Sequence, residues 1–233
     1  MVKLQNTFFI FNPKSYLYGE SLLELAIIAD KEAEKYPELS IFVTAPYADI
    51  STIASQTENV IVTAQHIDGI QPGRGMGAVL PASIKNMGAE ATFLNHAEKP
   101  MTLNQLTQAI SLAEENEIMT IVCADSIEEA KAIAVLNPTI ILCEPTELIG
   151  TGKTSDEEYI HSTNSAIKEI NSNVLVMQAA GISTPEDVFR TIQLGADGTG
   201  CTSGIVKAEN PKQMLKDMIE AALEGSKRNL KEN

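Results

Sequence analysis

The sequence predicts an α/β protein with the layout of a (β/α)8 barrel in a single domain. Short apolar runs alternate with amphipathic helical runs along all 233 residues, which makes about eight strand–helix units, each roughly 29 residues long. The strand runs are continuously apolar, as expected for parallel strands that are covered on both faces. A doubly wound open sheet is the alternative, but 12–14 reads Asn-Pro-Lys where such a sheet would carry a dinucleotide-binding glycine motif.

The elements follow one another in regular order. The predicted strands lie at 8–11, 39–43, 60–64, 91–94, 118–122, 139–142 and 174–177, and an eighth begins at 196–198. The predicted helices lie at about 20–35, near Ser51, up to Met87, at about 102–115, after a cap at Asp125 and Ser126, and at about 211–224. Apolar residues recur with helical spacing between 20 and 35, and a glycine-rich loop at 69–77 follows the third strand. We expect one domain over 1–225 and a loose tail over 226–233, which is mainly polar and charged.

Charge and composition exclude several classes of partner. The net charge of −14 argues against nucleic acid, which requires a basic face. No apolar run reaches the ~20 residues that a membrane-spanning helix needs, and the first residues lack a signal-peptide pattern. Cys123, Cys143 and Cys201 each follow an apolar run, so they are predicted to be buried strand residues in a reducing, cytoplasmic setting.

Polar residues close several of the predicted strands. Asn12 and Lys14 follow the first strand, His96 follows the fourth and Glu144 follows the sixth. Each has an ordinary interpretation, such as a solvated lysine or a histidine that caps the next helix. Because barrel enzymes carry their chemistry at the carboxyl ends of the strands, the joint placement predicts a site on one rim.

Two further patterns suggest a ligand with a negative charge. Glu144-Pro145 is followed by glycines at 150 and 152, which is how a general base would be held beneath a flap, although an ordinary loop is the alternative. Gly181 and the small residues at 202–204 lie in the loops after the last two predicted strands, where backbone N–H groups before a helix can bind phosphate. The bland interpretation of 181–187 is a helix start with Ser183 or Thr184 as N-cap.

Taken together, these segments resemble the triosephosphate isomerase family, and more closely its archaeal-type branch. The likeness runs nearly the whole length, through 12–14, 64–68, 94–98, 144–152, 181–184 and 203–208. It implies that the chain interconverts dihydroxyacetone phosphate and D-glyceraldehyde 3-phosphate through an enediolate, in glycolysis and gluconeogenesis. A small phosphorylated sugar would be its substrate.

The resemblance also implies roles for individual residues. The catalytic set would be Glu144 as base, His96 as neutral electrophile, and Lys14 with Asn12 orienting the substrate. The implied substrate-binding residues are Asn12, Lys14, Ile149, Gly150, Gly181, Thr202, Ser203 and Gly204. We expect no cofactor and no metal, and His66, which comes nearest to a ligand, is predicted to be structural.

The sequence departs from the family pattern at a few positions. Ala97 stands where the family has serine, and Thr202 is bulkier than the usual alanine. These changes leave open another small ketose phosphate, such as a tetrulose phosphate, as the substrate. A non-catalytic phosphate-binding barrel is a further alternative. The loop 72–77 resembles the inter-subunit loop of the family, which implies a homodimer or homotetramer.

Overall fold

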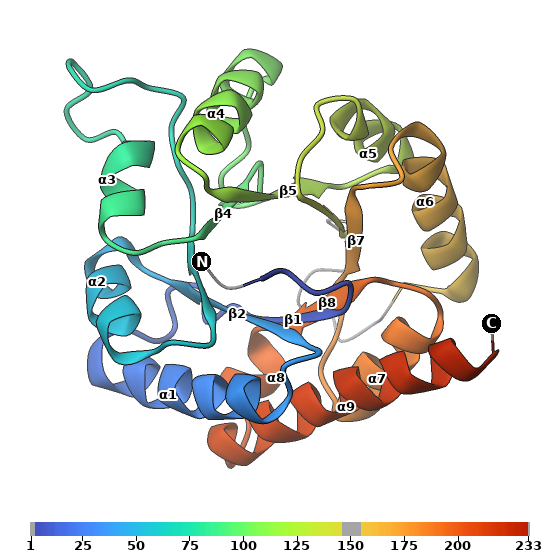
Figure 1. The fold of residues 1–233 in the computed structure, drawn as a ribbon. Helices are drawn as coiled ribbons and strands as arrows, with labels where there is room; N and C mark the ends of the chain where they lie inside the picture. The colour runs from blue at the N-terminus through green and yellow to red at the C-terminus, as the bar shows by residue number, and fades with distance from the viewer. Residues whose placement is uncertain (1–2, 146–154, 233) are drawn as a thin grey trace.

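The computed structural model of the chain describes residues 3–145 and 155–232, with side chains up to residue 227. Within these residues, eight parallel strands close into a barrel in chain order from β1 to β8, which confirms the predicted fold (Figure 1). The strands are β1 Phe8–Phe11, β2 Ser40–Ala45, β3 Ile61–Ala64, β4 Ala91–Leu94, β5 Met119–Ala124, β6 Ile140–Cys143, β7 Leu175–Gln178 and β8 Gly198–Cys201. The last strand begins at Gly198, whereas the sequence predicted its start at 196.

Helices surround the barrel on its outer side (Figure 1). They are α1 Gly19–Lys35, α2 Tyr47–Gln56, α3 Pro81–Asn86, α4 Leu103–Glu115, α5 Ile127–Ala134, α6 Glu157–Ile170, α7 Pro185–Gln193, α8 Ser203–Val206 and α9 Pro211–Glu232. Ser126 alone caps α5, because its hydroxyl accepts the N–H of Glu129. Helix α9 continues past Glu224 to Glu232, so it includes most of the segment predicted to be a loose tail. Polar residues there are good helix formers, and charge alone made them resemble a frayed end.

Apolar side chains on the two faces of the strands form two cores. Phe8, Ile10, Phe42, Phe93 and Met177 belong to the cluster inside the barrel, whereas their strand neighbours pack outward against the helices. Both faces are therefore buried, which explains the continuous apolar runs. A Cβ on Gly198 would lie 2.2 Å from the ring of Phe8, so a strand that lacks bulky side chains makes room for this phenylalanine.

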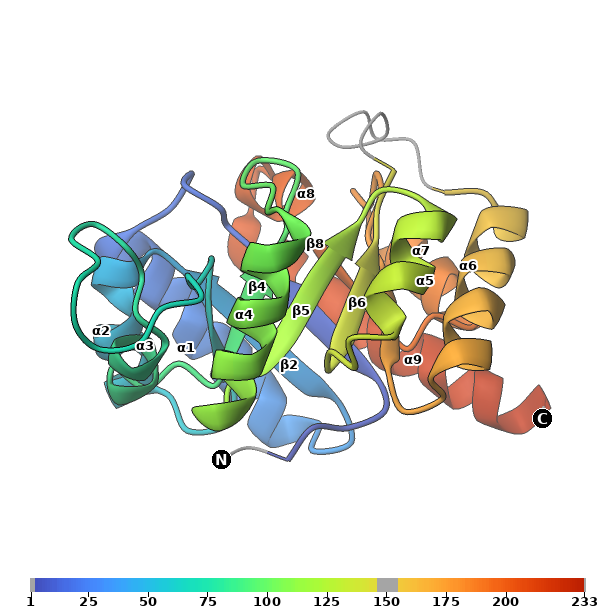
Figure 2. The ribbon, with the colours of Figure 1, turned by 90° about the horizontal axis from the view of Figure 1, so that it is seen from above.

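The parallel strands present their carboxyl ends at one edge of the barrel. In Figure 2 the arrows of β5 and β6, which are hydrogen-bonded neighbours, run toward the same edge. The three cysteines are buried strand residues with free thiols, as the sequence predicted. Among the described residues, no helix has the length and apolar character needed to traverse a bilayer.

Candidate active site

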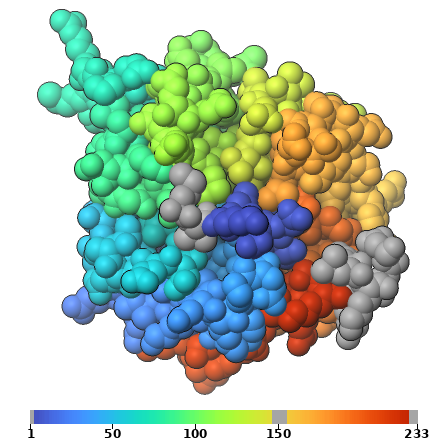
Figure 3. All heavy atoms as spheres, in the orientation of Figure 1, coloured from blue at the N-terminus to red at the C-terminus, as the bar shows by residue number. Residues whose placement is uncertain are grey.

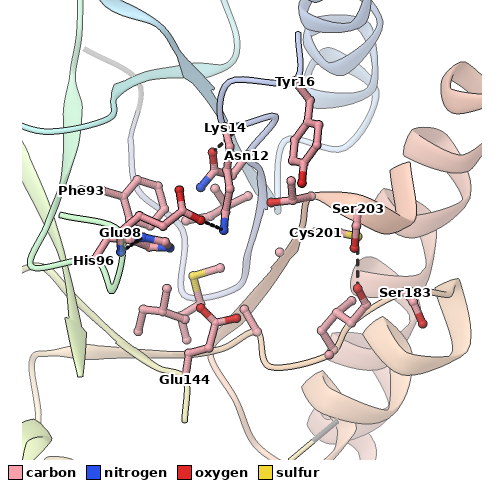
Figure 4. Close-up of a pocket in the computed structure, with 18 of the residues that line it drawn as sticks. Asn12, Lys14, Tyr16, Phe93, His96, Glu98, Glu144, Ser183, Cys201 and Ser203 are labelled. Carbon is pink, nitrogen blue, oxygen red and sulfur yellow. Dashed lines mark hydrogen bonds and ion pairs between the residues drawn. The ribbon is translucent and has the colours of Figure 1, made fainter. Parts of the chain in front are cut away.

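A cavity of about 240 Å³ opens among the carboxyl ends of the strands and brings most of the predicted residues together. Asn12, Lys14, His96, Glu144, Gly181, Thr202 and Ser203 all line it. Figure 4 shows His96 and Lys14 on one side of this space and Ser183 and Ser203 on the other. Ile149 and Gly150, which were predicted to bind the substrate, lie outside the described residues.

Lys14 forms the positive centre of the first side. Its ammonium group donates a hydrogen bond to Oε1 of Glu98 at 2.6 Å. The backbone of Lys14 has a φ of 49°, in the left-handed region that side chains disfavour. Asn12 Oδ1 accepts the Lys14 N–H at 3.0 Å, and the amide of Gln65 donates to the Lys14 carbonyl at 2.8 Å. Asn12 and Gln65 therefore hold the lysine in a strained conformation that points it into the cavity.

His96 is held as a neutral ring with a defined tautomer. The backbone N–H of Glu98 donates to Nδ1 at 3.1 Å, which assigns the ring proton to Nε2. Burial, and next the charge of Lys14, hold the pKa of His96 below its usual value. Helix α4 begins at Leu103 with Thr102 as its N-cap, so His96 does not lie at the start of a regular helix.

Asn95 fixes the turn that carries His96. Its backbone also lies in the left-handed region, with a φ of 56°. Its amide nitrogen donates to the carbonyl of Cys123 at 3.1 Å and to Glu129 at 2.9 Å, and its oxygen accepts the N–H of Met101 at 2.9 Å. The imidazole is thus positioned by a network that reaches β5 and α5.

Glu144 lies directly after β6, where its N–H donates to the carbonyl of Ala124 at 3.0 Å. Burial raises the pKa of Glu144, and the nearby Lys14 charge opposes that rise. The carboxylate is therefore a stronger base than an exposed glutamate, and a cation beside it favours the ionised form. Glu144 also lines a smaller cavity of about 100 Å³ together with His96 and Ala97.

The small-residue side of the cavity is packed tightly. Thr184 caps α7, which confirms one of the two predicted N-caps, and both Ser183 and Thr184 donate to Asp187 Oδ2. A Cβ on Gly204 would lie 2.6 Å from the Ser183 carbonyl oxygen. Gly204, which was predicted to bind the substrate, is not among the residues lining the cavity; its lack of a side chain lets α8 approach the loop after β7.

Cys201, the last residue of β8, forms a hydrogen bond with the loop after β7. Its Sγ lies 3.3 Å from the carbonyl oxygen of Ile182, and the thiol donates to it. Burial raises the pKa of this thiol to about 11, so the proton needed for that hydrogen bond stays in place at neutral pH. The loop after β7 is therefore joined to the end of β8 by a hydrogen bond and to α8 by close packing.

His66 lines a neighbouring cavity together with Asn12, Lys14 and His96 and is not among the residues that line the main cavity. The ring is 5% exposed, and Nε2 lies 3.1 Å from Oδ1 of Asp68, as expected of a structural histidine. Over the described ranges, no group of three or more His, Cys, Asp or Glu side chains is arranged to hold a metal ion.

Sequence reasoning missed several residues that line the cavity. Glu98 was quoted as part of a motif without a role, although it follows His96 by two positions at the same strand end. Tyr16, Ser183 and Lys207 also line the cavity. Tyr16 and Lys207 each lie a few residues beyond a strand end, and Lys207 also belongs to the segment 203–208 that resembles the family.

The fold and the cavity together define a class of protein. A barrel that gathers a buried carboxylate, a neutral imidazole and a lysine at the carboxyl ends of its strands is a barrel enzyme of the acid–base type. The family model described as triosephosphate isomerase matches residues 7–222. The chain belongs to the triosephosphate isomerase family.

Individual relatives agree with that family. The chain is 39% identical over 216 residues to triosephosphate isomerase of Methanocaldococcus jannaschii, covering 91% of this chain and 98% of the relative. It is 40% identical over 215 residues to the enzyme of Methanobacterium bryantii, covering 90% and 94% of the two chains. It is 36% identical over 218 residues to that of Sulfurisphaera tokodaii, covering 92% and 94%.

Proposed function

We propose that this chain interconverts dihydroxyacetone phosphate and D-glyceraldehyde 3-phosphate, with Glu144 and His96 moving the protons. The observation that carries the proposal is that both groups line a single cavity, together with a lysine. Relatives that match this chain over nearly their whole length are named triosephosphate isomerases, which supports the same activity. The reaction moves only protons, so its chemistry needs neither an electron carrier nor a group carrier.

Glu144 is the base in this proposal. It takes a proton from C1 of dihydroxyacetone phosphate and returns it to C2, which leaves an enediolate between the two steps. The raised pKa of Glu144 increases its basicity, while Lys14 keeps enough of it ionised to react. A carboxylate tuned in this way suits proton abstraction next to a carbonyl.

His96 and Lys14 stabilise the oxygens on which charge develops. The neutral ring presents its Nε2 proton to the substrate because Nδ1 is occupied by the Glu98 N–H. The ammonium group of Lys14 adds a positive charge in the same cavity. Fixed donors of this kind help most in the transition state, where the oxygens carry more negative charge than in the substrate.

The phosphoryl group would lie at the small-residue side of the cavity. Gly181, Thr202 and Ser203 line it there and leave room for an oxyanion to approach the backbone. Asp187 and Gly204 act indirectly, since they hold the loops in place. The reacting carbons would then lie toward His96, Lys14 and Glu144.

Substitution of the base tests this division of labour. We expect Glu144→Gln to lower kcat by at least about 10³-fold, because removal of a general base has an effect of that order. Inhibition by inorganic phosphate should change less than about twofold. The matched control is Glu34→Gln on the exposed face of α1, which should behave as the parent enzyme. Equal losses of turnover and phosphate binding would contradict the assignment.

A tetrulose phosphate is the second candidate substrate. Thr202 lines the cavity where the family usually has alanine, and this changes the shape of the phosphate side. Coupled assays with both triose phosphates and with tetrulose phosphates separate the two readings, since turnover of tetrulose phosphates alone would rule out the first. Binding of phosphoglycolate without proton exchange at C1 or C3 would instead support a non-catalytic barrel.

We further propose that the chain belongs to the archaeal-type branch of the family. Segments 64–68 and 94–98 carry the motifs of that branch. Relatives from methanogens and Sulfolobales at similar identity support the placement. A tree built from both branches would contradict it if this chain grouped with the other branch.

We also propose one domain over 1–225 and a cytoplasmic location. The three free cysteines support the cytoplasmic location.

A homodimer or homotetramer is the proposed assembly. The loop between β3 and α3 stands out from the surface at the upper left of Figure 3. A cavity of about 250 Å³ beside His96 is lined by His66 and Thr44, whose buried Nδ1 and Oγ1 atoms have no hydrogen-bond partner among the described residues. A loop from a second copy of the chain would supply hydrogen-bond partners for these two atoms. Light scattering after gel filtration tests this, and a parent protein that stays monomeric at micromolar concentration would exclude it.

A further inference from the structure

The charged side chains around the cavity are unevenly paired. The ammonium group of Lys14 is matched by Glu98 at 2.6 Å, and Glu144 adds a second carboxylate. Lys207 is a further cation in the lining, and over the described parts of the chain no carboxylate lies within ion-pair distance of its ammonium group. Lys207 therefore brings a charge to the cavity that no carboxylate among the described residues pairs with.

The backbone of Lys207 is fixed at the small-residue side. The residue directly follows α8, and its N–H donates to the carbonyl of Ser203 at 3.1 Å. Ser203 itself lines the cavity, and Gly204 packs α8 closely against Ser183. The start of the lysine side chain is thus held beside the loop to which we assign the phosphoryl group.

Tyr16 orients the ammonium group without neutralising it. The Nζ of Lys207 lies 5.9 Å from the centroid of the Tyr16 ring, near the outer limit of a cation–π contact. Tyr16 lines the same cavity and is 57% exposed, so the pair stands at its rim. An aromatic ring attracts a cation but leaves its positive charge available to an anion.

The charges of the side chains that line the cavity show why the cation of Lys207 matters for an anionic substrate. With Glu98 and Glu144 ionised and His96 neutral, the described residues of the lining carry as many positive as negative side chains only if Lys207 is counted. The chain as a whole has a net charge of −14. A phosphate dianion entering such a protein needs a local cation, because distant charges are screened within about 8 Å.

We propose that Lys207 recognises the phosphoryl group and makes the enzyme selective for phosphorylated substrates, with Tyr16 positioning its ammonium group. The inference rests on the proposed function, because it assigns the phosphate to this side of the cavity. Lys207 acts in binding, so its removal should affect phosphorylated substrates and leave the proton-transfer groups intact.

The test compares Lys207→Met with Lys207→Arg. For D-glyceraldehyde 3-phosphate we expect Lys207→Met to lower kcat/KM about tenfold, and Lys207→Arg to stay within about threefold of the parent. Deuterium exchange into unphosphorylated D-glyceraldehyde, followed by NMR, should be unchanged in both variants. Inhibition by inorganic phosphate should weaken in Lys207→Met by a factor similar to the loss in kcat/KM. The matched control, Lys227→Met, removes a charge from an exposed ion pair with Glu38 and should have no effect.

Two results would overturn the inference. One is an unchanged kcat/KM for the phosphorylated substrate in Lys207→Met, and the other is an equal loss on the unphosphorylated substrate. If Lys207→Met fails to fold, a Tyr16→Leu variant replaces it and should give a smaller loss of the same selectivity; equal losses on both substrates would then overturn the inference. If the parent enzyme isomerises no triose phosphate, the proposed function fails, and calorimetric titration of parent and Lys207→Met with inorganic phosphate still decides the role of Lys207.

Discussion

The ammonium group of Lys14 and the carboxylate of Glu98 meet at 2.6 Å, although 84 positions separate them in the chain. The ion pair holds a cation between the two groups assigned to proton transfer. The Lys14 charge lowers the pKa of His96 and opposes the rise in the pKa of Glu144. One lysine therefore adjusts both the electrophile and the base.

Removal of this lysine should change the titration of the histidine. In Lys14→Met we expect the pKa of His96 to rise, because a nearby positive charge is lost and Glu98, which raises the pKa of His96, remains. Nitrogen-15 NMR of the imidazole measures the shift, and kcat/KM should fall by at least about 100-fold. Lys131→Met on α5 is the charge-matched control. A pKa of His96 that falls or stays constant would contradict the electrostatic role.

Neutralising the base should stabilise the fold at high pH. Burial raises the pKa of Glu144 in the folded state, so its contribution to stability is fully present at low pH and is lost as pH rises through the folded pKa. Glutamine cannot ionise. We therefore expect the Tm of Glu144→Gln, relative to the parent, to increase between pH 4 and pH 8. Thermal unfolding followed by circular dichroism measures the two Tm values. A Tm difference that stays constant or shrinks between pH 4 and pH 8 would show that burial does not raise the pKa of Glu144.

Restoring the hydroxyl next to the histidine should lower the pKa of the base. Ala97 and Glu144 line the same small cavity, and a serine at position 97 could donate to the carboxylate. A donor to the charged form favours ionisation. For Ala97→Ser we expect the acidic limb of the kcat/KM profile to move to lower pH, whereas Ala97→Val should leave it in place. A shift to higher pH would be inconsistent with such a hydrogen bond.

Gly204 offers a way to separate packing from phosphate binding. A Cβ there would lie 2.6 Å from the Ser183 carbonyl oxygen, so Gly204→Ala should cost about 1–3 kcal/mol of unfolding free energy and raise KM. The matched control is Gly225→Ala. Gly225 lies in α9, away from the cavity, and a Cβ there would lie 2.9 Å from the Phe189 carbonyl oxygen. Urea unfolding and steady-state kinetics should show both variants destabilised but only the first with a higher KM. The same change of KM in both would remove the link between Gly204 and the phosphate loops.

Most of the fold could be predicted because parallel strands buried on both faces leave a clear apolar signal. The weakest predictions concerned segments without that signal. Gly198, Thr199 and Gly200 lie in β8 through pairing with Phe8, Phe9 and Ile10 on β1, and the two glycines have no preference for a strand. Residues 226–232 resemble a tail in composition but continue α9.

The candidate site was predictable where a polar residue directly follows a strand. His96, Glu144 and Lys14 were found in that way, and the structure brings them to one cavity. The packing role of Gly204 and the cause of the lowered pKa of His96 could not be predicted, because both depend on what surrounds the residue. Gly204 packs against the Ser183 loop, and burial together with the charge of Lys14 lowers the pKa of His96.

The sequence by itself determined the order of strands and helices and the residue types that stand at the strand ends, since hydrophobic period and local chemistry are properties of neighbouring residues. Only the tertiary structure decided which of those residues meet and with what charge. The pairing of Lys14 with Glu98, and the lack of a carboxylate partner for Lys207 among the described residues, depend on distances between segments far apart in the chain. The pKa values of His96 and Glu144 depend on burial, which exists only once the barrel has closed.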